Sequence, residues 1–229
     1  MEVLHSFAYL KKNASLSLLF NCQDLKTHGV ESMSIQSSCW EDFYPDASDL
    51  IPNNTPPSRG RSVSITCYVD SDHAGDLHNR RSHSGVIIYL QSAPIIWFSK
   101  KQTTIETSTH GAELVATRAA IELIEGLRYK LRMFGISING PATVYCDNES
   151  VVNNATRPDS VLKKKHNSIS YHKIQESVAA GIIVVYKYHH LKIHQTYSPR
   201  LYQGLQLHFM LVTCYFRFKN HDYFDCLFF

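Results

Sequence analysis

The segment SVSITCYVDSDHAGD, residues 62–76, combines a strand pattern with a cluster of acidic residues at its end. Its first half alternates β-branched and aromatic residues with polar ones, which predicts a half-buried β-strand. Asp70, Asp72 and Asp76 then fall within seven positions. Carboxylates after a strand can hold a metal ion or can simply stabilise a turn, and the rest of the sequence has to separate these two interpretations.

Two further strands are predicted downstream, in residues 84–91 and 94–102. Both are apolar and rich in β-branched residues, and Pro94 stands at a strand start, where proline is tolerated. Short polar loops separate the three strands. Consecutive strands joined by short loops indicate an antiparallel meander.

The segment 107–135 changes to a helical period, because its apolar residues fall on or near one helical face. These residues are Leu114, Val115, Ala119, Ile121, Leu123, Ile124, Leu127 and Leu131. Thr107, Ser108 and Thr109 are candidate N-caps, and Gly135 suits a C-terminal stop. The pattern predicts one long helix.

The remaining segments complete a mixed sheet. Residues 140–152 have the pattern of a short strand leading into a helix, 163–181 that of a basic helix, and 182–188 that of a fifth strand. A strand reached through a helix lies parallel to an earlier strand. The predicted fold class is therefore α/β (α+β): a mixed five-stranded sheet with three antiparallel strands, then parallel strands, flanked by helices.

Composition limits the classes of protein that fit. The 229 residues are 44% hydrophobic with a net charge of +3, which excludes a disordered chain and favours one main domain. The six cysteines form no Cys-x-x-Cys pair, and the first residues lack the pattern of a secretory signal. We therefore expect an intracellular protein with reduced thiols, in which Cys67 and Cys146 are core residues. No apolar run is long enough to span a membrane, so no membrane partner is expected.

Basic pairs and runs offer contacts to phosphate groups, although charged runs are more often a solvated surface. They are Arg59 with Arg61, Arg80 with Arg81, Lys100 with Lys101, and residues 163–165.

Three carboxylates are placed by this topology near one another. Asp70 closes the first strand and Asp147 the fourth, and neighbouring parallel strands lie about 5 Å apart. Glu113, near the start of the long helix, could point over the same strand ends. Oxygen ligands without competing thiolates suit Mg²⁺ or Mn²⁺, and such a group is the outline of a phosphodiester-hydrolysis site.

Each carboxylate also has a simpler interpretation. Asp70 could be a turn residue, Glu113 an exposed carboxylate at a helix start, and Asp147 a helix N-cap ahead of Asn148. The pattern alone leaves both interpretations open.

Four blocks of sequence carry a resemblance to a known family. They are YVDSDHAGDLHNRRSHSGVIIYL (68–90), APIIWFSKKQTTIETSTHGAELVA (93–116), YCDNESV (145–151) and LKKKHNSISYHKIQESVAAGII (162–183). In this order and spacing they strongly resemble the ribonuclease H domain of copia-type retrotransposon polyproteins, from about residue 59 to residue 186. FAYLKK (7–12) is similar to the end of the preceding reverse transcriptase.

The resemblance implies the ribonuclease H fold and hydrolysis of the RNA strand of an RNA–DNA hybrid. By position, Asp70, Glu113 and Asp147 match the family's catalytic, metal-binding carboxylates, with two Mg²⁺ or Mn²⁺ ions expected in an intact member. Asp72 and Asp76 are placed in the outer shell or the loop, and His73 receives no catalytic role. An intact element's reverse transcriptase is a further candidate partner.

The resemblance also implies a division of the chain. Residues 1–20 are expected to be a remnant of the reverse transcriptase's C-terminal helix, 21–62 a linker with an aromatic cluster around Trp40, 63–188 the ribonuclease H-like domain, and 189–229 an aberrant tail.

The tail lacks the family's final helix, which carries a fourth carboxylate. Codons compatible with LKIHQTYSPRLYQ (191–203), read two bases on, give Glu-Asn-Pro-Pro-Asp-Ile-Leu-Thr-Lys-Ala-Leu-Pro, the motif expected there. We hypothesise that a frameshift truncates the domain, with the lost aspartate falling across Gln195 and Thr196. A genuine tail with Asp222 or Asp225 as substitute ligands is the competing interpretation.

Three hypotheses for function follow. The chain is a metal-dependent ribonuclease H impaired by the missing carboxylate, or a catalytically dead remnant that at most binds nucleic acid. A structural α/β interaction domain with acidic loops is the third, which the four matching blocks disfavour.

Overall fold

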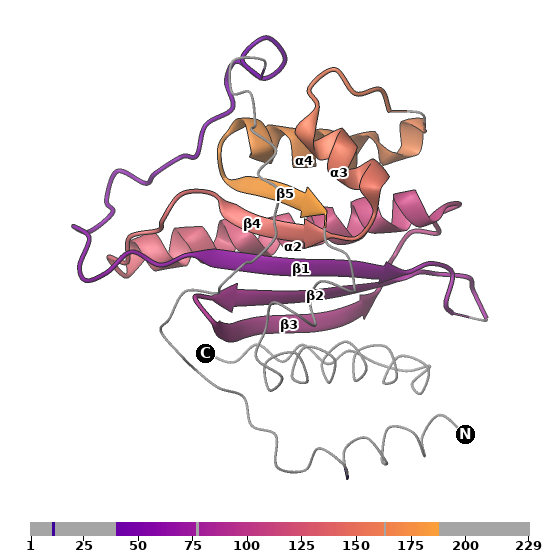
Figure 1. Ribbon diagram of the computed structural model, residues 1–229, viewed down its shortest axis with the longest axis horizontal. Helices are drawn as coiled ribbons and strands as arrows, with labels where there is room; N and C mark the ends of the chain where they lie inside the picture. Colours follow the sequence, from indigo (N-terminus) through magenta and orange to yellow (C-terminus); the bar gives the residue numbers. More distant parts are fainter. Residues whose placement is uncertain (1–10, 12–39, 77, 163, 188–229) are drawn as a thin grey trace.

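The computed structural model describes residue 11 and residues 40–76, 78–162 and 164–187. One mixed sheet with helices packed against it forms the centre of the described chain (Figure 1). The elements, in chain order, are β1 (Ile65–Asp72), β2 (His83–Leu90), β3 (Ala93–Lys101), α2 (Thr109–Met133), β4 (Ala142–Cys146), α3 (Glu149–Thr156), the short 3₁₀ helix η2 (Lys165–Asn167), α4 (Ser168–Ala179) and β5 (Ile183–Lys187).

The sheet has the strand order β3-β2-β1-β4-β5. β1 pairs antiparallel with β2, and β2 pairs antiparallel with β3. β4 joins the other edge of β1 in parallel, with Val69 opposite Cys146, and β5 is parallel to β4. The fold class expected from the sequence is confirmed in strand number, direction and order of appearance.

The long helix α2 begins and ends where its caps were expected. The Ser108 side chain accepts a hydrogen bond from the Gly111 backbone N–H at 3.3 Å, which satisfies one of the free donors of the first turn. At the other end Gly135 has a φ of 71°, a conformation that glycine adopts without a steric penalty.

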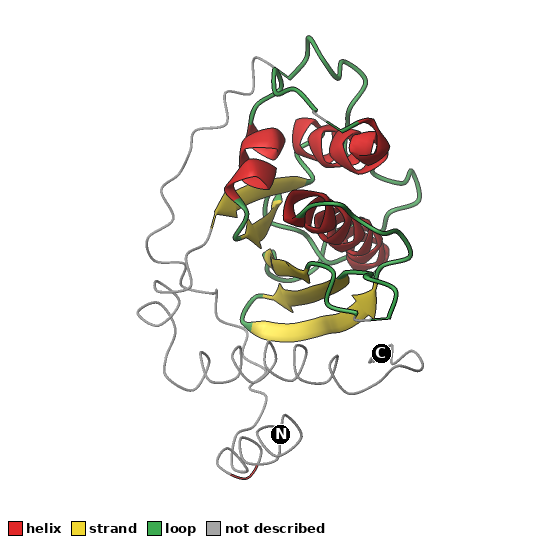
Figure 2. Cartoon of the chain, turned by 90° about the vertical axis from the view of Figure 1, so that its right-hand side faces the viewer, coloured by secondary structure: helices red, strands yellow, loops and turns green. Residues whose placement is uncertain are grey.

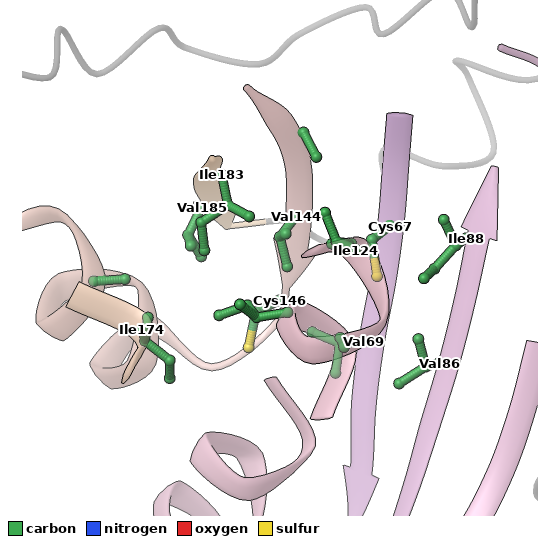
Figure 3. Close-up of a cluster of buried hydrophobic side chains, with 14 of the residues drawn as sticks. Cys67, Val69, Val86, Ile88, Ile124, Val144, Cys146, Ile174, Ile183 and Val185 are labelled. Carbon is green, nitrogen blue, oxygen red and sulfur yellow. The ribbon is translucent and has the colours of Figure 1, made fainter. Parts of the chain in front are cut away.

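The main core lies between the sheet and the helices, and α2 and α4 stand on one side of the sheet in Figure 2. Alternate residues of the strands face this core, including Cys67, Val69, Val144 and Cys146, which Figure 3 shows within one apolar cluster. α2 contributes Leu114, Ile121 and Ile124, all fully buried. Cys67 and Cys146 are both free and buried, as expected for core cysteines.

The opposite face of the sheet carries a row of tyrosines across four strands. Tyr68 and Tyr145 stack with ring centroids 5.0 Å apart. Tyr89 and Tyr186 extend the row on either side at 6.0 and 6.2 Å. Cross-strand aromatic pairs of this kind stabilise the pairing of β1 with its neighbours, and β1 positions Asp70.

Residues 40–62 pack against the domain at several points. Trp40 is buried in the main core. Asp49 accepts hydrogen bonds from Arg128 at 2.5 Å and from Arg132 Nη1 at 2.8 Å, so the segment is tied to the last turns of α2. The domain boundaries themselves stay predictions, and the regions 189–229 and 1–20, apart from residue 11, lie outside the described residues.

Candidate metal centre

Asp70 lies within strand β1 and not in the turn that follows it. The Ser71 backbone N–H donates to Asp70 Oδ1 at 2.8 Å and to Glu113 Oε1 at 3.0 Å, and the Ser71 hydroxyl donates to Glu113 Oε1 at 2.9 Å. One residue therefore holds the carboxylates of a strand and of a helix together. The interpretation of Asp70 as a simple turn residue is wrong.

Glu113 is buried, with 5% of its surface exposed. It lies one turn into α2, on the side of the helix that packs against β1. A carboxylate that only complemented the helix dipole would point into solvent. Its burial beside Ser71 contradicts the interpretation of Glu113 as an exposed helix-start residue.

Asp147 follows β4 directly and brings the third carboxylate to the same end of the sheet. Because Val69 and Cys146 are register partners, Asp70 and Asp147 each come one residue after a paired position. The cap of α3 is Asn148, whose side chain accepts from the Ser150 and Val151 backbone N–H groups at 3.0 and 3.4 Å. Asp147 is therefore not the N-cap, and its carboxylate is left available for another role.

The electrostatics of the site centre on Glu113. Burial raises the pKa of Glu113 to about 8, and the negative charges of Asp70 and Asp147 add to the increase, against the opposing hydrogen bonds from Ser71. Within the described residues, Glu113 and Asp147 form no ion pair with a lysine, arginine or histidine. Two carboxylates that lie close together without a basic partner form an environment in which a bound cation stabilises most.

A thiol lies in this site, which the sequence analysis did not expect. Cys146 Sγ is 3.8 Å from Glu113 Oε2, and the donor atoms of Glu113, Cys146 and Asp147 all lie within 4.8 Å of one another. The expectation of oxygen ligands without a competing thiol is wrong in this respect. The signal was available, because side chains alternate along a strand and Cys146 had to face the helix that carries Glu113.

Of the other two aspartates of the opening segment, Asp72 is the last residue of β1 and Asp76 lies in the loop that follows. Asp76 is buried and forms an ion pair with Lys101 at 2.7 Å. The hydrogen bond from Lys101 and the backbone N–H of His78 lower the pKa of Asp76 to about 2. Asp72 packs over Gly75, because a Cβ added at Gly75 would lie 1.9 Å from Oδ2 of Asp72. Both residues therefore shape the loop beside the site.

Basic side chains line the same end of the sheet. Lys100 is exposed and lies in one row with Ser84 and Ser71, two strands away from the site. Neighbouring strands are about 4.8 Å apart, so this row spans roughly 10 Å. Lys164 reaches the loop before α2, where it donates to Thr107 Oγ1 at 2.8 Å. Lys163 lies outside the described residues.

The donor set fits a divalent cation. Glu113 and Asp147 lie close enough to share one ion with Cys146, whereas Asp70 lies outside this group and is linked to Glu113 through the Ser71 backbone N–H. Hard oxygen donors suit Mg²⁺ or Mn²⁺. Among the helices of the described chain, none has the length and apolar character needed to cross a bilayer.

No protein-family model matches the chain, and the curated proteins similar to it include several retrotransposon polyproteins. The retrovirus-related Pol polyprotein from transposon RE2 of Arabidopsis thaliana is 30% identical over 147 residues, covering 64% of this chain and 10% of the relative. The Pol polyprotein from transposon TNT 1-94 of Nicotiana tabacum is 32% identical over 111 residues, covering 48% and 8%. The chain thus spans about 10% of the length of the Arabidopsis thaliana Pol polyproteins that it matches. The resemblance to copia-type retrotransposon polyproteins is confirmed.

Comparison with solved structures gives matches with TM-scores below 0.5. LC11-RNase H1 in complex with an RNA/DNA hybrid has 18% identity and a TM-score of 0.44, covering 56% of this chain and 88% of that chain. The protease-reverse transcriptase of prototype foamy virus has 18% identity and a TM-score of 0.44, covering 72% of this chain and 22% of that chain. These likenesses concern the fold alone.

Proposed function

We propose that this chain is a retrotransposon-derived ribonuclease H-like domain, built for divalent-metal-dependent hydrolysis of the RNA strand of RNA–DNA hybrids. The observation that supports this most is that Ser71 links Asp70 of β1 to Glu113 of α2, while Glu113 and Asp147 belong to one group of potential ligand atoms. Each of the simpler interpretations of these residues fails in the structure. Homology to retrotransposon Pol polyproteins adds an independent reason to expect this chemistry.

In this proposal Asp70, Glu113 and Asp147 would hold the metal ions. When bound, such ions supply an activated water and stabilise the leaving 3′-oxygen. Glu113 holds a proton at neutral pH in the metal-free site, because its pKa is raised to about 8, and it releases that proton when a cation takes its place. Ser71 keeps Glu113 oriented through two hydrogen bonds to the same oxygen, Oε1, whereas Oε2 accepts the long hydrogen bond from the Cys146 thiol at 3.8 Å.

The basic row suits the backbone of a nucleic acid. Lys100 lies on β3 and Lys164 directly before η2, where phosphates of a duplex crossing the sheet end could meet them. Such contacts position a duplex without reading its sequence, and 2′-hydroxyls in the wide minor groove distinguish the RNA strand. Sequence-independent binding is therefore the expected mode.

A second candidate function is binding without turnover. The described residues supply three carboxylates, and the fourth expected from the family would have come from the tail, where the frameshift is hypothesised. Loss of one ligand weakens the binding and positioning of one ion, so we expect slower hydrolysis than in an intact domain. A dead remnant would bind hybrids and leave them uncut.

The test is cleavage of a hybrid with a labelled RNA strand in Mg²⁺ or Mn²⁺. The full chain is compared with Asp70→Asn, and with a chain whose reading frame is restored from residue 191. We expect slow cleavage by the full chain, faster cleavage by the restored chain, and none by Asp70→Asn. If a folded, restored chain binds hybrid and still leaves it intact, the enzymatic proposal is wrong and the binding function remains.

A further inference from the structure

The thiol of Cys146 faces the carboxylates, although β4 carries it into the core. Its Sγ lies 3.8 Å from Glu113 Oε2, and Asp147 completes a group whose donor atoms lie within 4.8 Å of one another. In a tetrahedral Zn²⁺ site the Zn–S distance is about 2.3 Å and the Zn–O distance about 2.0–2.2 Å, so the sulfur and the oxygen lie roughly 3.5 Å from each other. The observed spacing is therefore close to that of two atoms bound to the same soft cation.

A second buried group points to the same place. Thr117 follows Glu113 by one turn of α2 and is fully buried, and its hydroxyl has no hydrogen-bond partner among the described residues. It lies within reach of the Cys146 sulfur, where it can donate to a thiolate. A buried hydroxyl without a partner is costly, and a thiolate bound to a cation would satisfy it.

We propose that Cys146, Glu113 and Asp147 form a mixed sulfur–oxygen site for a thiophilic divalent cation, of the class of Zn²⁺ or Cd²⁺, which displaces Mg²⁺. The claim that this cation regulates hydrolysis rests on the proposed function. The claim that the cation binds does not. Soft thiolate ligands select such cations, and Mg²⁺ gains nothing from sulfur. On binding, the Cys146 S–H bond breaks, a sulfur–metal bond forms, and the proton passes to the solvent.

The molecule offers a matched control for this site. Cys67 is as deeply buried as Cys146 and lies on the neighbouring strand β1, in the same apolar cluster (Figure 3). Its thiol donates towards the Tyr68 carbonyl oxygen, and it belongs to no group of metal-ligating residues among those described. Replacing Cys67 therefore reports the effect of removing a core thiol without touching the proposed ligands.

The experiment is a Cd²⁺ titration followed by the ultraviolet charge-transfer absorbance of a cadmium–thiolate bond. The parent is the full chain with Cys22, Cys39, Cys214 and Cys226 changed to Ser, so that only the two buried thiols remain. Cys67→Ala and Cys146→Ala are made in this parent, and Cys146→Ser serves if the alanine variant fails to fold. Folding is checked by circular dichroism.

We expect the absorbance in the parent and in Cys67→Ala, its reversal by excess Mg²⁺, and its loss in the Cys146 variants. Cd²⁺ affinity should fall by more than the roughly 10–100-fold that loss of an outer-shell partner costs. No absorbance in the parent, or an unchanged absorbance without Cys146, would overturn the inference. Mg²⁺-dependent hybrid cleavage is measured on the same samples: absorbance without cleavage refutes only the proposed function, and cleavage without absorbance refutes only the soft-cation site.

Discussion

Replacing Glu113 by Gln should stabilise the metal-free protein at alkaline pH. Glu113 has a pKa of about 8 in the folded protein and 4.5 as an ordinary glutamate, so between these values the folded state holds a proton that the unfolded chain has released. Stability therefore falls as the pH rises through this window. Gln is neutral throughout and its side-chain oxygen can still accept the hydrogen bonds from Ser71.

The size of the effect follows from the raised pKa. Each pH unit between the two pKa values costs about 1.4 kcal/mol, so a pKa raised from 4.5 to about 8 sets an upper limit of about 4–5 kcal/mol. Asp70 and Asp147 contribute part of this increase, and either can relieve it by taking up a proton itself. We therefore expect Glu113→Gln to raise the free energy of unfolding by about 2–4 kcal/mol near pH 9, and by less than about 1 kcal/mol near pH 4.5.

The assay is urea unfolding followed by circular dichroism across this pH range, with a chelator present. Glu122→Gln is the matched control, because Glu122 lies on the same helix, is exposed, and pairs only with Arg118 within the described residues. Its effect should stay within about 0.5 kcal/mol at every pH. Equal stability of wild type and Glu113→Gln near pH 9 would refute the buried, charge-coupled carboxylate described above.

Three other changes test the scaffold and the site. Asp49→Ala leaves the buried Arg128 guanidinium without its partner, so urea unfolding should show a loss of about 3 kcal/mol, against less than about 0.5 for the exposed Asp46→Ala. Gly111→Ala places a Cβ 2.5 Å from Glu106 Oε2 and should lower the melting temperature. Gly126→Ala adds a Cβ in open space and should raise the melting temperature, because alanine reduces the backbone entropy of the unfolded chain. Mg²⁺ at a hundred times its Kd should stabilise wild type by about 2.7 kcal/mol and Asp147→Asn by clearly less.

Local sequence patterns predict the elements that position the site. Alternation in β1, the helical period of α2 and the cap at Ser108 follow from interactions within a few residues, so they can be recognised without a structure. The parallel pairing of β1 with β4 also follows, because a helix crosses between them. Once this pairing is given, Asp70 and Asp147 are neighbours.

Such local patterns do not predict contacts between segments that are distant in the sequence. Asp49 pairs with arginines on α2 about 80 residues away, and nothing in the composition of residues 40–62 distinguishes it from the other acidic residues there. Burial of Glu113 and its link to Ser71 depend on how α2 crosses β1. The role of Ser71 therefore emerged only from the packing, whereas the direction of the Cys146 side chain follows from the alternation of side chains along β4.

The central claim is that Asp70, Glu113 and Asp147 share one divalent-cation site, and direct Mg²⁺ binding to the full chain tests it most closely. Calorimetric titration of wild type, Asp70→Asn and Asp72→Asn, the latter changed at the last residue of β1, separates the site from the neighbouring acidic residues. We predict that Mg²⁺ binds wild type and Asp72→Asn alike and binds Asp70→Asn at least roughly tenfold more weakly. Equal Mg²⁺ affinity in all three proteins would contradict the claim.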